Sequence, residues 1–142
     1  MKFVSVATFA ALVATAFAQR AEIGSPKAGA QVTAGSSFSV QVDRPNSLTG
    51  SQEMSIVIGF QSCASSPCHA PTDGIGRVLY SGAYNPQFSS PSDALPPHQN
   101  FDVTVPDSTP KGAAQLSLVH FSLVGASVVP LFETSTVDIT VV

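Results

Sequence analysis

The sequence predicts an all-β fold, an immunoglobulin-like β-sandwich of about seven strands, with a small β-barrel as the alternative. Three observations support this prediction. Apolar and polar residues alternate over several short stretches, which is the period of a strand with one buried face. Segments rich in Pro, Gly, Asn and Ser separate these stretches and are typical of turns. After the first 18 residues, no stretch shows the three-and-four spacing of apolar residues that indicates a helix.

The chain opens with an apolar leader. Lys2 is followed by an uncharged run of apolar and small residues that ends in Ala16-Phe17-Ala18. This is the pattern of a secretory signal peptide with a small-x-small cleavage site. We therefore expect residues 1–18 to be a signal peptide, residues 19–142 to form a single β-sandwich domain, and the product to be secreted and extracellular.

The candidate strands follow in order along the rest of the chain, at residues 21–23, 31–33, 37–42, 54–60, 77–80, 101–105, 113–123 and 136–141. The fourth stretch is apolar on both faces around Val57, which is typical of a central strand. In residues 113–123 the apolar phase changes near His120, which indicates a bulge or a strand that is apolar on both faces. We expect three side chains of the fourth stretch in the core: Ile56, Ile58 and Phe60.

The two cysteines are predicted to form a disulfide. Cys63 and Cys68 have four residues between them, and thiols in an oxidising compartment tend to pair. Because the closed ring is short, we expect it to shape one loop and to add little to global stability. A zinc site needs four ligands, and His69 beside Cys68 adds one at most, so we expect no metal.

Two long connections are the candidates for binding. Residues 61–76 carry the two cysteines, and residues 81–100 contain four prolines with Tyr84 and Phe88 between them. Long loops without secondary structure are commonly functional, and prolines lower the entropic cost of ordering a loop against a partner. We expect Tyr84 and Phe88 to contribute to a protein-binding surface, with the loop at residues 61–76 as a second candidate. The alternative is that both rings fold back over an open sheet face.

Composition argues against several classes of function. A net charge of −3, with 6 basic and 9 acidic residues, disfavours nucleic acid or an anionic membrane as a partner. No second apolar run is long enough for a membrane span. We find no nucleophile motif and no pair of facing acids, and a lone His in an apolar strand, such as His120, is usually a structural residue. We therefore expect no catalytic residues and no cofactor.

An ordered series of short segments resembles the necrosis-inducing secreted protein (Nis1-like) family of small fungal effectors. The segments that carry the resemblance are residues 21–23, 34–38, 56–60, 76–80, 82–86, 96–101, 103–106, 111–116 and 121–126, the last of which reads Phe-Ser-Leu-Val-Gly-Ala. The resemblance implies a non-enzymatic effector that binds host proteins, namely receptor-associated immune kinases of plants, and dampens defence, with cell death as a side effect. Separately, we expect the protein to be a monomer. The family brings no catalytic residues, and the Cys63–Cys68 loop departs from its plant-pathogen members.

A second class of function stays open. The opening of the predicted domain, from Ile23-Gly24-Ser25-Pro26 to Ala34-Gly35-Ser36, also looks like the immunoglobulin-like domain of fungal cell-wall proteins. This alternative implies a structural or carbohydrate-binding module of the wall, and it predicts a Ser/Thr-rich tail that does not follow Val142 in this sequence. Firm binding to insoluble glucan or chitin would favour it.

Overall fold

The computed structural model describes residues 20–47 and 49–142 and contains eight strands in that part of the chain. The predicted signal peptide lies outside the described residues. In chain order the strands are β1 (Glu22–Ser25), β2 (Gln31–Val32), β3 (Ser37–Asp43), β4 (Ser51–Ser62), β5 (Arg77–Ala83), β6 (His98–Thr104), β7 (Gly112–Val124) and β8 (Val129–Val141). The described residues contain no helix, so none there is long and apolar enough to cross a membrane.

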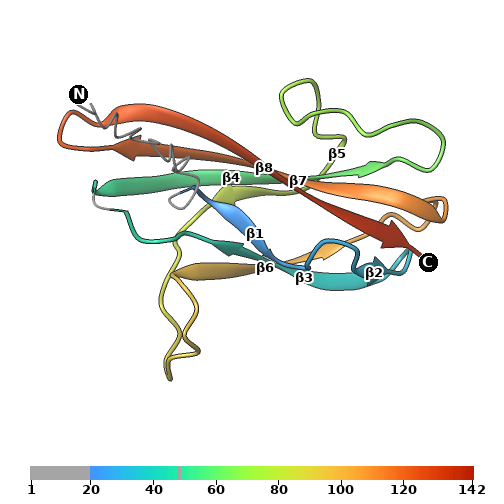
Figure 1. The fold of residues 1–142 in the computed structure, drawn as a ribbon, viewed down its shortest axis with the longest axis horizontal. Coiled ribbons are helices and arrows are strands. Elements are labelled where there is room, and N and C mark those ends of the chain that lie inside the picture. The colour runs from blue at the N-terminus through green and yellow to red at the C-terminus, as the bar shows by residue number, and fades with distance from the viewer. Residues whose placement is uncertain (1–19, 48) are drawn as a thin grey trace, which may run out of the picture.

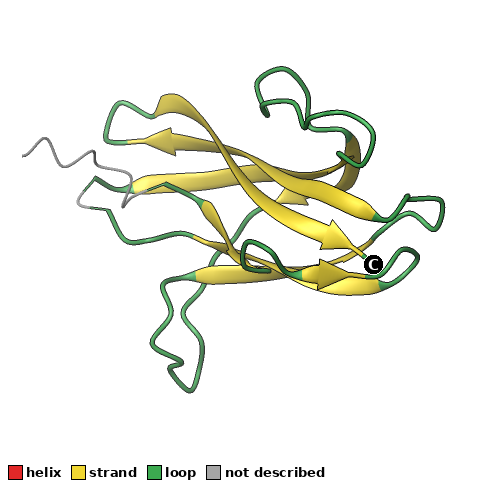
Figure 2. Cartoon of the chain, turned by 45° about the vertical axis from the view of Figure 1, so that its right-hand side comes forward, coloured by secondary structure: helices red, strands yellow, loops and turns green. Residues whose placement is uncertain are grey.

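The strands form two sheets packed face to face (Figures 1 and 2). One sheet has the order β1-β3-β6 and the other the order β2-β8-β7-β4-β5. The two sheets also approach each other at both sides, where β1 lies beside β8 and β6 lies beside β5. The all-β prediction is confirmed, and the near-closure at both sides gives the sandwich some of the character of the predicted barrel alternative.

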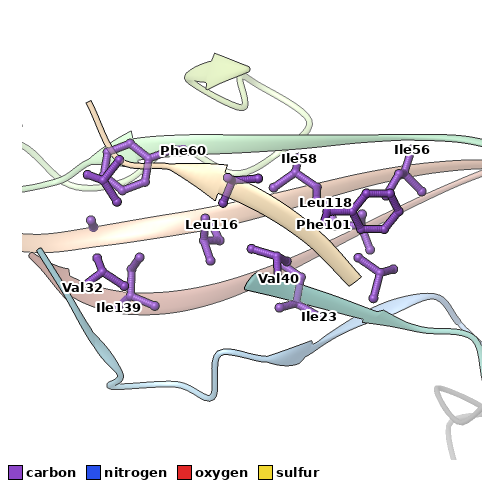
Figure 3. Packing of buried hydrophobic residues seen from close by; sticks show 14 of the residues in the cluster. Ile23, Val32, Val40, Ile56, Ile58, Phe60, Phe101, Leu116, Leu118 and Ile139 are labelled. Carbon is purple, nitrogen blue, oxygen red and sulfur yellow. The ribbon is translucent and has the colours of Figure 1, made fainter. Parts of the chain in front are cut away.

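The core lies between the two sheets (Figure 3). Alternate residues of each strand point inward, so the buried side chains come from strands far apart in sequence. Ile56, Ile58 and Phe60 are buried, as predicted. Their buried neighbours include Ile23, Val40, Phe101, Leu116, Leu118 and Ile139.

Two strands are longer than the alternation predicts. β4 begins at Ser51 and β8 at Val129, and β7 pairs with both of these added segments. β7 pairs with β8 without a break in register, whereas the register against β4 shifts between Glu53 and Ser55. The strand at residues 113–123 is therefore apolar on both faces, and the bulge is assigned to its neighbour β4.

Candidate partner-binding surfaces

A disulfide joins Cys63 to Cys68, as the sequence predicts, with the two Cα atoms 5.1 Å apart. The loop that contains it folds back over the outer face of β4. There a Cβ atom on Gly59 would lie 2.3 Å from the backbone oxygen of Ile75, closer than any side chain tolerates. Glycine at position 59 therefore allows the loop to contact the sheet.

The side chain of Gln61 anchors the same loop. Its amide nitrogen donates to the backbone oxygens of His69, at 3.2 Å, and Gly74, at 2.9 Å. Its amide oxygen accepts from the backbone nitrogen of His69 at 3.1 Å. Gln61 itself is buried, and a buried amide with three hydrogen bonds holds its partners in a defined place. The loop is thus fastened at its base by the disulfide and near its middle by Gln61.

The structure corrects the expectation that Tyr84 reaches a partner. Tyr84 is only 2% exposed, and its hydroxyl donates to the backbone oxygen of Val42 at 3.1 Å. Its ring packs edge-on against His120, with centroids 5.4 Å apart. Burial, together with the nearby negative charge of Glu53, raises the pKa of the hydroxyl. Tyr84 is a core residue because its amphipathic ring satisfies both the apolar interior and one backbone carbonyl.

Phe88, by contrast, is 62% exposed and lies on a projecting connection between β5 and β6 (Figure 1). The backbone of Gln87 pairs with that of His98 across the base of this connection. Farther out, Asp93 accepts from the hydroxyl of Ser89 at 2.7 Å and from the backbone nitrogen of Leu95 at 3.0 Å. These bonds hold the pKa of Asp93 below its usual value. The prediction of a partner contact is therefore retained for Phe88.

A largely buried group of ionisable side chains was not found by sequence reasoning. Its centre is His120 of β7, which has no exposed surface. The Nε2 atom of His120 lies 2.5 Å from Oε2 of Glu53, and Nδ1 lies 3.0 Å from Oε2 of Glu133. Arg44 approaches the same two carboxylates, at 2.9 Å from Glu53 and 3.8 Å from Glu133. Arg20 lies 3.9 Å from Glu133. We call Arg20, Arg44, Glu53, His120 and Glu133 the ionic cluster.

The ionic cluster fixes the charge of Glu53. Burial alone would raise the pKa of this carboxyl, but contacts with His120, Ser51 and Arg44 outweigh burial and lower it to about 2. A buried charge costs several kcal/mol unless it is paired and hydrogen-bonded. Glu53 lies against Arg44 and His120, and its Oε1 atom accepts hydrogen bonds from Arg44 and Ser51. The cluster therefore joins β4, β7 and β8 to the segment that follows β3.

The burial of His120 limits the chemistry of this residue. General acid–base catalysis requires the catalytic group to come within hydrogen-bond reach of a substrate. His120 has no exposed surface and both of its ring nitrogens face carboxylates, so it does not reach a molecule in solution. Its role in this structure is to hold strands together, in agreement with the sequence-based interpretation of this residue.

No short motif indicated the ionic cluster. Its members are spread from residue 20 to residue 133 and come together only when the sheets form. One signal was available in the sequence: His120 and Glu133 are single ionisable residues within strands. Such residues are rarely buried without partners, so each indicated a partner elsewhere in the chain. Within residues 20–47 and 49–142, no group of three or more His, Cys, Asp or Glu is arranged to hold a metal ion.

Comparisons with known proteins identify the family. The model of the Nis1 family matches residues 16–140, nearly the whole chain. The chain belongs to the Nis1 family. Membership confirms the resemblance seen in the sequence and suggests a fungal effector-like protein that is not an enzyme. None of the curated proteins matches the Nis1-family chain in sequence.

Two solved structures resemble this Nis1-family domain in fold, both variants of a superoxide reductase (neelaredoxin) from Ignicoccus hospitalis. Each has a TM-score of 0.50, with 13% and 12% sequence identity. The similarity covers 87% and 88% of this chain and 81% and 82% of theirs. At such low identity the similarity concerns the fold alone, because one fold hosts many unrelated functions.

Proposed function

We propose that this chain is a secreted, non-enzymatic effector that binds a host protein of the receptor-associated immune-kinase class and dampens defence signalling. The observation that carries the proposal is the match to the Nis1 family over residues 16–140. Two further features support it. The disulfide between Cys63 and Cys68 is compatible with an oxidising, extracellular environment. His120, the centre of the ionic cluster, has no exposed surface and so does not reach a substrate.

We assign the host contact to the projecting connection around Phe88. An exposed aromatic ring is a common centre of a protein–protein interface. The hydrogen bonds of Asp93 with Ser89 and Leu95 order this connection before binding. A pre-ordered loop loses less conformational entropy when it binds, which favours affinity. The loop anchored by Gln61 is the second candidate surface.

The test is a parallel pull-down from plant extract and from isolated fungal cell wall. We expect enrichment of receptor-associated kinases from the plant extract and a loss of this enrichment with Phe88→Ala. Val78→Ala is the matched control, because it also shortens an exposed apolar side chain but lies on β5. A melting curve for each variant confirms that it is folded.

One outcome would overturn the proposed function, and another would overturn only the surface assigned to Phe88. Firm binding to insoluble glucan or chitin, with no kinase recovered, would favour the cell-wall module. Kinase recovery that Phe88→Ala and Val78→Ala leave equally intact would support the host partner but refute the surface assigned to Phe88.

A further inference from the structure

The surroundings of the His120 ring fit only one of its protonation states. The ring has no exposed surface, and each of its nitrogens faces a carboxylate oxygen. Nε2 lies 2.5 Å from Oε2 of Glu53 on β4, and Nδ1 lies 3.0 Å from Oε2 of Glu133 on β8. A neutral imidazole has one N–H and one lone pair, whereas the imidazolium has an N–H on both nitrogens. In a neutral ring, one lone pair would therefore point at a carboxylate oxygen, too close for a water between them.

Glu53 does not supply a proton to the ring. Burial raises the pKa of this carboxyl, but contacts with His120, Ser51 and Arg44 outweigh burial and lower it to about 2. Its Oε1 atom also accepts hydrogen bonds from Arg44 and Ser51, and such charge-assisted bonds favour the ionised form. Glu53 is therefore a carboxylate in neutral solution, and the proton between it and His120 belongs to the ring.

Glu133 is surrounded by donors as well. Its Oε2 atom accepts from the backbone nitrogen of Ala21 at 3.5 Å and lies 3.8 Å from Nη1 of Arg44. Its Oε1 atom lies 3.9 Å from Nε of Arg20. Donors and cations favour the charged form of a carboxyl group. We therefore assign the proton between Glu133 and His120 to the ring too.

The formal charges in this part of the fold balance when the ring is charged. Three carboxylates lie here, those of Asp43, Glu53 and Glu133. Two guanidinium groups lie against the cluster, those of Arg20 and Arg44. Burial raises the pKa of the Tyr84 hydroxyl, so the Tyr84 side chain against His120 is uncharged. A positive charge on His120 makes the two signs equal, and buried charges are tolerated where they are paired.

We propose that His120 is an imidazolium in neutral solution, that it locks β7 to β4 and β8, and that alkaline pH releases this lock. The charged ring forms an ion pair through Nε2 with Glu53 and donates through Nδ1 to Glu133. Loss of its proton leaves a lone pair against a buried carboxylate, which is unfavourable because the carboxylate then lacks its partner. The stabilisation from this proton is therefore lost as the pH rises through the titration of the ring.

The lock acts on one half of β8. Glu133 is the contact of this strand with the ring, and among the described residues the segment 129–137 pairs with β7 alone. Deprotonation of His120 should therefore loosen this half of β8 first. The pH dependence has the opposite sign to that of Glu53, whose contribution is lost as the pH falls. The two groups thus limit the stability of the fold at opposite ends of the pH range.

NMR on ¹⁵N-labelled wild-type protein measures the protonation state directly. In neutral solution we expect both ring nitrogens of His120 to carry a proton, each with its own N–H coupling. As the pH is raised, the amides of Glu133 and Thr134 should shift together with the ring. The exposed ring of His69 is the internal control, and His120 should keep its second proton after His69 has lost its own.

Urea unfolding over the same pH range tests the lock. The midpoint of the wild type should fall as the pH rises through the titration of His120 measured by NMR. His120→Gln keeps a hydrogen-bonding side chain but carries no charge, so it should have a lower midpoint in neutral solution and lose this fall. His69→Gln is the matched control, because it replaces an exposed histidine outside the cluster, and it should follow the wild type.

A ring with one unprotonated nitrogen in neutral solution overturns the proposal, including the case in which the proton lies on Glu133 instead. A wild-type midpoint that does not follow the titration of His120, or one that falls equally in His120→Gln, refutes the lock. If His120→Gln does not fold, the NMR titration and the urea curves of the wild type and His69→Gln still decide.

Discussion

Acid should weaken this protein through Glu53. The pKa of this carboxyl is about 2 in the folded state, against an ordinary value of 4.5. Because folding lowers the pKa, the stabilisation from Glu53 is fully present above pH 4.5 and is lost as the pH falls from 4.5 towards 2. The contacts responsible are those of His120 and Arg44 in the ionic cluster.

The size of the effect follows from the shift. The difference between these two pKa values corresponds to about 3.4 kcal/mol at full strength. Glu53 keeps some contact with solvent, and solvent screens ion pairs, so we expect about 2 kcal/mol. Glu53→Gln should therefore lower the free energy of unfolding by about 2 kcal/mol at pH 7, and this difference from wild type should shrink towards zero near pH 2.

Urea unfolding of both proteins between pH 7 and pH 2 measures this difference. Comparing the two curves isolates Glu53 from the other groups that titrate in the same range. Glu22→Gln is the matched control, because Glu22 is exposed and lies outside the ionic cluster, and it should follow wild type closely. Parallel curves for wild type and Glu53→Gln below pH 4.5 would refute the reasoning, since they would mean that the cluster does not hold Glu53 ionised.

Three other predictions concern the core and the loops. Phe60→Ala should lower the free energy of unfolding by about 3–5 kcal/mol, because it truncates a buried ring. A change in the urea midpoint that corresponds to less than about 1 kcal/mol would place Phe60 at the surface. Alkylation without reductant should label neither Cys63 nor Cys68 in intact-mass analysis, and replacing both with Ser should cost less than about 2 kcal/mol, because the ring is short. Tyr84→Phe should lower the free energy of unfolding by about 1 kcal/mol, because it removes the hydrogen bond to Val42, and host binding should persist in the pull-down. A loss of binding at an unchanged melting temperature would show that Tyr84 contacts the partner.

Local patterns were sufficient for the fold class and for most of the strands. Alternation from Phe38 to Val42 and the two-faced run around Val57 are properties of neighbouring residues, and both report burial directly. The pairing of Cys63 with Cys68 was equally accessible, because a separation of five residues keeps the two thiols close in any compact loop. The resemblance to the Nis1 family also depended on the order of local segments, and the family match confirmed it.

What the sequence left open depended on contacts between distant segments. Tyr84 and Phe88 lie four residues apart in the same connection, yet Tyr84 is buried and Phe88 is exposed. Tyr84 packs against His120 of β7, and its hydroxyl donates to the carbonyl of Val42 on β3, 42 residues away. Both contacts are with segments distant in the sequence.

The ionic cluster and the length of β8 have the same origin. Glu53, His120 and Glu133 meet only after β7 has paired with both β4 and β8. The length of β8 likewise comes from pairing, since residues 129–135 show little alternation and become a strand against β7. Periodicity records which face of a strand is buried, whereas charge pairing and strand edges are set by neighbours far along the chain. Only the tertiary structure therefore decided them.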